Sequence, residues 1–161
     1  VDFNPGPGTD VMSNSVGDDV FLTSYSSVGS YRWTVNLGND ENNQASTVVA
    51  DDFGNIYLGG FYQGTLDFDP GTDTVNRTSA GLRDAFVSRF DTAGALLDTW
   101  VFGSTGNDKA LTFDVDSSGE LTAAGTFAGT IDLDPREATE DSFTAAGSAD
   151  GFFLRLAPEA Q

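Results

Sequence analysis

Carboxylates beside a proline-containing turn are the residues of this chain with the clearest capacity for chemistry. Asp67 and Asp69 flank Phe68 in the motif LDFDPG, and Asp73 follows shortly after the glycine. On an extended strand the two aspartates project to one side and Phe68 to the other. Three carboxylates near one bend, with the carbonyl groups of the turn, could hold Ca²⁺ at about 2.4 Å. The alternative is a turn in which the carboxylates cap backbone amides.

The motif occurs three times, at an interval of 65 residues: VDFNPG at 1–6, LDFDPG at 66–71 and IDLDPR at 131–136. The equivalent candidate ligands are Asp2, Asn4 and Asp10 in the first copy and Asp132 and Asp134 in the third, with Glu140 or Asp141 further on. Arg136 replaces the turn glycine of the third copy, which favours a turn without metal there. Calcium is the one cofactor that these loops suggest, and both interpretations of them stay open.

Other chemistry has less support. The segment DVDSSGE at 114–120 imitates the start of an EF-hand loop, but its counterpart places Val49, Asp51 and Phe53 at the ligand positions, which favours a hairpin turn. The chain has no His and no Cys, which excludes most catalytic triads and thiolate chemistry. Trp33 and Trp100 fall in strand patterns, where they are expected to pack between sheets rather than to bind sugars. We therefore expect no enzyme, with a carboxylate-based hydrolase or lyase fragment as the least favoured alternative.

Composition restricts the partners. The chain has 161 residues with 25 acidic and 7 basic side chains, a formal net charge of −18. Nucleic acid is not an expected partner, because a phosphate backbone needs Lys and Arg. The acidity serves solubility or, as the alternative, the binding of divalent cations. No apolar run is long enough for a membrane helix, so no membrane span is expected.

The repeat extends well beyond the acidic motif. DDFGNIYLGGFYQGT at 51–65 aligns with DSSGELTAAGTFAGT at 116–130, and DVFLTSY at 19–25 aligns with DAFVSRF at 84–90. Each unit contains four short strand patterns, which we call positions A, B, C and D. The predicted strands are 45–50 and 110–115 for A, 56–62 and 121–127 for B, 21–25, 86–90 and 152–156 for C, and 31–37 and 96–102 for D.

The connections group these strands into antiparallel sheets. The segments 51–55, 116–120, 91–94 and 26–29 begin with Asp or Ser and carry Gly at the fourth position, which predicts a type I turn followed by a left-handed glycine. Position B reaches position C through a loop of about twenty residues that opens with the Asp-Pro motif. The pair Gly59-Gly60 predicts that another backbone or layer packs closely on position B. Four antiparallel strands joined in this way are typical of one blade of a β-propeller.

The segments DDFGNIYLGGFYQGTLDFDPGTD and DAFVSRFDTAGALLDTW resemble the SBBP-type propeller repeat of large secreted bacterial proteins. The resemblance covers nearly the whole chain, and it departs from the pattern at Arg136 and after Leu156, where no position D follows. It implies an extracellular or cell-surface bacterial protein.

The fold class predicted is all-β, with propeller-like blades of four antiparallel strands and about two and a quarter blades in this chain. The predicted units are a partial blade at 1–41 (C and D), a complete blade at 42–106 and a partial blade at 107–161 (A to C). The chain starts at Val without a signal peptide, so we expect a processed product or a piece of a longer protein. The expected partners are further blades, or copies of the chain, at exposed strand edges. A structural scaffold that presents loops is the favoured function, with a lectin-like or calcium-dependent binding module as the alternative.

Overall fold

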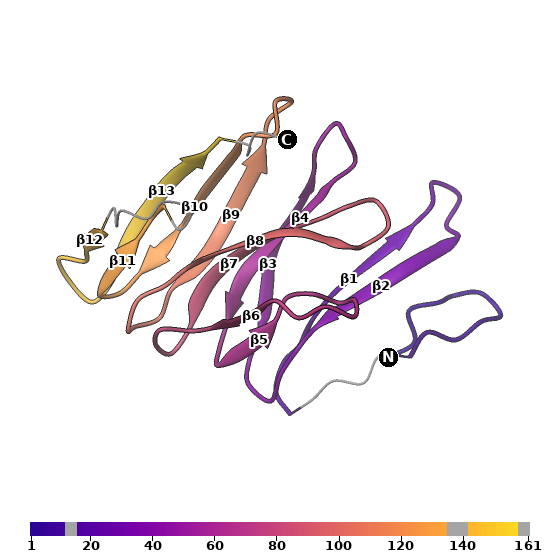
Figure 1. Cartoon of the computed structure of the whole chain (residues 1–161), viewed down its shortest axis with the longest axis horizontal. Helices are drawn as coiled ribbons and strands as arrows, with labels where there is room; N and C mark the ends of the chain where they lie inside the picture. Colours follow the sequence, from indigo (N-terminus) through magenta and orange to yellow (C-terminus); the bar gives the residue numbers. More distant parts are fainter. Residues whose placement is uncertain (12–15, 135–141, 158–161) are drawn as a thin grey trace.

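The computed structural model describes residues 1–11, 16–134 and 142–157, and this part of the chain is all-β, without a helix (Figure 1). No helix in it is therefore long and apolar enough to cross a membrane. The strands are β1 (Val20–Tyr25), β2 (Tyr31–Leu37), β3 (Gln44–Ala50), β4 (Ile56–Tyr62), β5 (Thr65–Asp67), β6 (Asn76–Thr78), β7 (Asp84–Phe90), β8 (Leu96–Phe102), β9 (Lys109–Val115), β10 (Leu121–Phe127), β11 (Thr130–Asp132), β12 (Ser142–Thr144) and β13 (Asp150–Leu156).

Three antiparallel sheets follow one another along the chain and lie side by side (Figure 1). The first contains β1 and β2, the second has the order β3-β4-β7-β8, and the third has the order β13-β10-β9. These sheets contain the predicted two, four and three strands in the predicted order, so the propeller-like blade architecture is confirmed. The predicted boundaries at 41/42 and 106/107 fall in the connections between sheets, and the division into domains stays a prediction.

The connection from position B to position C is more ordered than the sequence predicted. Residues 63–83 were expected to form a plain loop, but β5 and β6 pair there as a short hairpin, and β11 and β12 do the same in the third unit. In the first unit an isolated bridge joins Asp2 to Val11, which matches the pairing of Asp67 with Asn76 one repeat later. Three-residue strands without clear alternation were too short to recognise in the sequence.

The four tight hairpin turns have the predicted geometry. Gly29, Gly54, Gly94 and Gly119 all have φ between 80° and 85°, the left-handed region that glycine adopts without strain. In each turn the first residue accepts the glycine N–H through its carbonyl group, as Asp91 does from Gly94 at 3.1 Å. The side chain of Asp91 also accepts the N–H groups of Ala93 and Ala95. This explains why the chain repeats Asp or Ser at the first position of these turns.

The hydrophobic core lies between neighbouring sheets. One cluster of buried side chains joins the first sheet to the second, around Leu37, Phe68 and Phe86. The other joins the second sheet to the third, around Trp100, Phe113 and further residues of β9, β10 and β13. The close approach predicted at Gly59-Gly60 is confirmed, because a Cβ built on Gly59 would lie 2.7 Å from the Phe113 ring of the next sheet.

Candidate functional site

The Asp-Pro motif forms a turn in which the carboxylates accept backbone N–H groups. Asp67 Oδ1 accepts from Asp69 N at 3.1 Å and from Val75 N at 2.9 Å, and Asp69 Oδ1 accepts from Gly71 N at 2.7 Å. Phe68 lies between them with its side chain fully buried. The turn interpretation therefore accounts for both carboxylates and for the aromatic residue of the motif.

The other two copies repeat this geometry. Asp2 Oδ1 accepts from Asn4 N and from Asp10 N, both at 3.0 Å, and Asn4 Oδ1 accepts from Gly6 N at 2.9 Å. These N–H groups, that of Asp10 foremost, lower the pKa of Asp2. In the third copy Asp132 Oδ1 accepts from Asp134 N at 3.0 Å.

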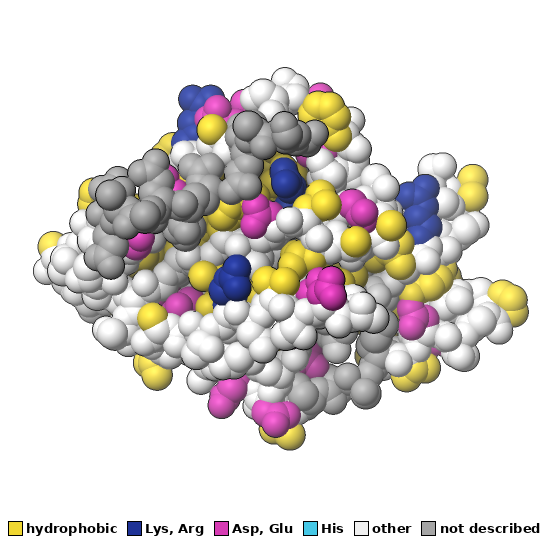
Figure 2. Space-filling view, in the orientation of Figure 1, with side chains coloured by type: hydrophobic (Ala, Val, Ile, Leu, Met, Phe, Trp, Pro, Cys, Tyr) yellow, Lys and Arg dark blue, Asp and Glu magenta, His cyan; other side chains and the backbone are white. Residues whose placement is uncertain are grey.

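The calcium hypothesis remains a prediction. Asp73 is exposed in the turn after Gly71, whereas Arg136, Glu140 and Asp141 lie outside the described residues. Within residues 1–11, 16–134 and 142–157, no three His, Cys, Asp or Glu side chains are grouped closely enough to hold a metal ion. Figure 2 shows the acidic side chains dispersed over one face of the molecule rather than gathered in one place.

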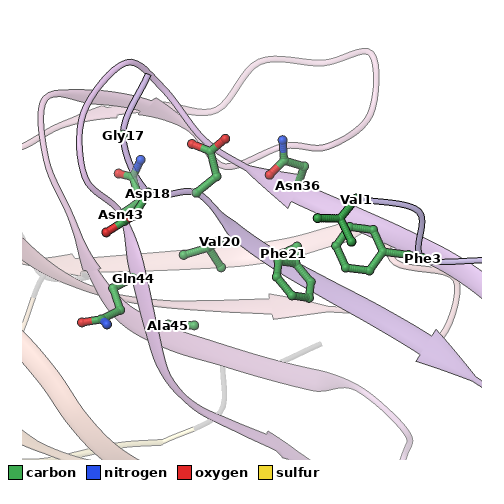
Figure 3. A pocket seen from close by; sticks show the side chains of 11 residues that line it. Val1, Phe3, Gly17, Asp18, Val20, Phe21, Asn36, Asn43, Gln44 and Ala45 are labelled. Atoms are coloured by element: carbon green, nitrogen blue, oxygen red, sulfur yellow. The ribbon is translucent and has the colours of Figure 1, made fainter. Parts of the chain in front are cut away.

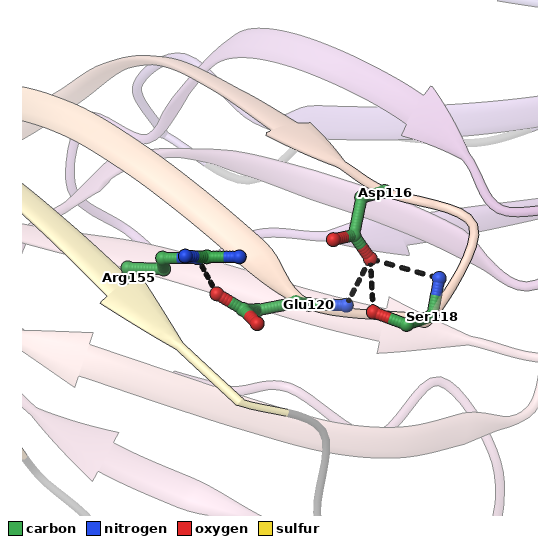
Figure 4. Close-up of polar contacts among 4 residues, drawn as sticks. All are labelled: Asp116, Ser118, Glu120 and Arg155. Atoms are coloured by element: carbon green, nitrogen blue, oxygen red, sulfur yellow. Dashed lines mark hydrogen bonds and ion pairs between the residues drawn. The ribbon is translucent and has the colours of Figure 1, made fainter.

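The EF-hand-like segment is a hairpin turn between β9 and β10 (Figure 4). Asp116 Oδ1 accepts from Ser118 Oγ at 2.6 Å, from Ser118 N at 2.8 Å and from Glu120 N at 3.0 Å. The Ser118 hydroxyl group is the main cause of a lowered pKa for Asp116. Glu120 also forms an ion pair with Arg155 of β13. These contacts use the acidic side chains to shape and brace the hairpin.

The two tryptophans pack between sheets, as expected. Trp100 is buried in the cluster between the second and third sheets. Trp33 packs against the cluster between the first two sheets, and its Nε1–H donates to the Thr92 carbonyl group at 3.0 Å. A Cβ built on Gly94 would lie 3.0 Å from the Trp33 ring, so this tryptophan rests on the turn of the complete blade.

Buried polar residues anchor the connections between sheets, and the sequence analysis missed them. Asp108 is buried and accepts from Ser104 N at 2.7 Å and from Ala128 N at 2.8 Å. Its counterpart one repeat earlier is Asn43, also buried, which accepts from Gln63 N at 3.3 Å. The signal available in the sequence was the alignment of the connections GNDENN at 38–43 and GSTGND at 103–108, in which a polar side chain recurs directly before position A.

Asp84, at the start of β7, is the most perturbed carboxylate among the described residues. It is buried, and its Oδ2 accepts from Ala80 N at 2.9 Å. Burial and the nearby Asp108 raise the pKa of Asp84 to about 6. Burial also raises the pKa of Tyr62, which lies near Asp84 on β4. The first residue of β7 therefore accepts a structural hydrogen bond, although burial makes the charged form of its carboxylate less stable.

A cavity of about 660 Å³ opens beside β1, toward the start of β3 (Figure 3). Its lining residues come from the N-terminal turn, from β1 and the residues before it, from β2, and from the start of β3 and the residue before it: Val1, Phe3, Gly17, Asp18, Asp19, Val20, Phe21, Asn36, Asn43, Gln44 and Ala45. The rings of Phe3 and Phe21 lie 4.4 Å apart, centroid to centroid. A shallower hollow continues from Phe21 to Val48 and Leu58. Among the described residues β1 pairs with β2 alone, so the cavity lies along an open strand edge.

A second open edge lies at the other end of the molecule. Strand β13 pairs with β10 on one side, and the described residues contain no strand on its other side. Phe153 of β13 is 72% exposed. The candidate site of this chain is therefore the open edges of the two position-C strands whose equivalent, β7, is paired on both sides, together with the adjacent apolar surface.

No family model matches the chain. It is 27% identical over 109 residues to the uncharacterized WD repeat-containing protein L264 of Acanthamoeba polyphaga mimivirus, a match that covers 59% of this chain and 8% of the relative. It is 32% identical over 104 residues to the regulatory protein FlaEY of Caulobacter vibrioides, covering 62% of this chain and 10% of the relative. The matched segments thus span a tenth or less of these relatives. WD repeats form the blades of β-propellers, which agrees with the sheets described above.

Proposed function

We propose that this chain is a non-enzymatic structural module whose blades join further blades, or copies of the chain, through the open edges of β1 and β13. The observation that carries the proposal is a contrast between equivalent strands. Strand β7 is paired on both sides, whereas β1 and β13 are each paired on one side among the described residues. An open edge offers backbone groups that hydrogen-bond to an added strand, and the apolar side chains beside it gain from being covered.

Two further observations support a scaffold. The similarity to a WD repeat-containing protein supports a repeat module of the propeller type. The resemblance of the repeat motifs to SBBP-type blades supports an extracellular or cell-surface location, where the turns at the blade ends would be available to ligands. The dispersed carboxylates of Figure 2 favour a binding or structural role over carboxylate-based hydrolysis.

The test is the mass of the chain in solution as a function of concentration. Light scattering after size exclusion should show particles larger than the 16.9 kDa chain, with a population that rises with concentration. Phe21→Asp and Phe153→Asp place a charge beside one open edge each, and each should reduce association. Phe53→Asp changes an exposed residue of the turn between β3 and β4, not at a strand edge, and serves as the control. A 16.9 kDa monomer at every concentration would exclude copies of the chain as the partner.

A further inference from the structure

The repeat defines what a strand beside β1 must look like. In the complete blade Phe86 of β7 faces Gly60 of β4, and in the third sheet Phe152 of β13 faces Gly125 of β10. Phe21 is the equivalent residue of β1. The position opposite the phenylalanine is therefore glycine in both sheets where the partner strand is described.

Steric contact explains this glycine. In both sheets the atom nearest to a Cβ built on this glycine is a carbonyl oxygen of the position-A strand, Gln44 O at 1.9 Å for Gly60 and Lys109 O at 2.2 Å for Gly125. The Phe152 ring is a further contact at Gly125, at 2.5 Å. Atoms cannot approach so closely without moving the strand. A position-B strand that pairs with β1 in the same register, and has its own position-A strand beside it, therefore also has glycine opposite Phe21.

The neighbouring position of the added strand must also be small. Phe113 of β9 is 4% exposed because it packs on Gly59 of the preceding blade. Val48 of β3 is its equivalent one repeat earlier and is 55% exposed, at the hollow that continues the cavity. A small residue next to the glycine would let Val48 pack on the added strand as Phe113 packs on Gly59.

The cavity itself matches an aromatic ring. In the complete blade Tyr62 faces Asp84, and its ring lies 5.2 Å from Phe68 and 6.4 Å from Phe86. Phe3, Phe21 and Asp19 are the equivalents of Phe68, Phe86 and Asp84, and all three line the cavity. Two rings of the aromatic cluster are thus in place, and the space beside them corresponds to the third.

The strands of this chain that have these features are already paired. Strand β4 lies between β3 and β7, and β10 lies between β9 and β13. Neither strand can leave its sheet without breaking two ladders of hydrogen bonds, so a folded copy of the chain can approach β1 only with an edge strand and does not supply an A–B segment with these features. The occupant that has these features is therefore an A–B segment other than the two that are paired in a folded copy of this chain.

We propose that the cavity beside β1 binds a strand–turn–strand segment of the A–B type that places glycine opposite Phe21, a small residue opposite Leu22 and an aromatic ring opposite Asp19. The inference rests on the proposed function, because it names the partner of one of the two open edges. Main-chain pairing along β1 provides affinity, the glycine lets the two strands of the segment pair closely, and the aromatic ring provides specificity.

A synthetic peptide with the sequence of residues 44–62 is the probe, and titration calorimetry with the whole chain is the measurement. We expect saturable binding with one peptide per chain. The same peptide with Gly60→Val should bind at least about tenfold more weakly, because a branched side chain clashes with the Gln44 carbonyl oxygen and prevents the A–B hairpin from pairing. The chain with Phe21→Asp should also lose at least about tenfold in affinity, whereas Phe153→Asp at the opposite edge should bind as the unaltered chain does. Circular dichroism of each variant verifies that the sheets are retained.

Absence of binding, equal binding of the Gly60→Val peptide, or equal loss with Phe153→Asp would each overturn the inference. The outcome for the proposed function is separate. If the chain self-associates in light scattering but does not bind the peptide, the proposed function stands and the inference about this partner is wrong. If the chain is monomeric and does not bind the peptide, both the proposed function and the inference about this partner are wrong.

Discussion

Strands β7 and β1 are the same element of the repeat in two different environments. Strand β7 lies in the middle of a four-stranded sheet, and all of its residues except Arg89 are buried. Strand β1 lies at an open edge, and Val20 is its one buried residue. Phe86 is 0% exposed, whereas its equivalent Phe21 is 54% exposed. The residue type is identical, so the difference comes from the neighbouring strand and from the sheet that packs on Phe86.

Local contacts are unchanged between the two strands. Ser88 hydrogen-bonds to Thr99 at 2.8 Å in the complete blade, and the equivalent Thr23 hydrogen-bonds to Thr34 at 3.1 Å beside the open edge. The Asp-Pro turns that precede the two strands in the sequence also make the same contacts between carboxylates and backbone N–H groups. The comparison shows that a repeat forms its hairpins and turns by itself, whereas burial of its apolar residues depends on the adjacent strand and sheet.

The largest expected difference between the two environments is the effect of removing the phenylalanine ring. Phe86→Ala should lower the free energy of unfolding by about 3–5 kcal/mol, because it leaves a cavity among Tyr62, Phe68 and their neighbours. Phe21→Ala should cost less than about 1.5 kcal/mol, because that ring is partly in water already. Urea denaturation of both variants is the measurement. Equal losses would contradict the view that the two strands differ in packing.

A smaller effect is expected where one blade packs on the next. Gly59→Ala places a Cβ 2.7 Å from the Phe113 ring and from the Phe86 carbonyl oxygen, so overpacking should cost about 1–3 kcal/mol. Gly147→Ala is the matched control, because nothing lies within 4 Å of a Cβ at that position and no loss is expected. Thermal unfolding of the two variants measures the difference. A stable Gly59→Ala chain would mean that the sheets separate easily.

The smallest expected effect is the pH dependence from Asp84. Its pKa is about 6 in the folded chain and has its ordinary value of 3.8 when the chain unfolds, so the folded state binds more protons between these values. This group therefore stabilises the fold least above pH 6, and its contribution falls as the pH rises from 4 to 6. Asp84→Asn should remove that part of the slope. The difference between the unfolding midpoints of the two chains at pH 4 and pH 7 measures it, and parallel slopes would contradict the assignment.

Much of this fold follows from the sequence because its signals are local. Alternating apolar residues located the nine main strands, and Asp or Ser before Gly located the four tight turns. The three copies of the Asp-Pro motif predicted that Asp67 and its equivalents shape a turn. The hydrogen bonds of these carboxylates show that they do. The short strands β5, β6, β11 and β12 were missed, because three residues do not establish a period.

The sequence by itself determined the repeat, the order of strands in a blade and the chemistry of the turns, since each depends on residues close together along the chain. Only the tertiary structure decided which copy of a residue is buried. It placed Phe113 on Gly59, buried Asp108 at a connection between sheets and left Phe21 beside an open cavity. The physical reason is that burial depends on what lies next to a strand in space, and identical repeats encounter different neighbours at the middle and at the ends of an array.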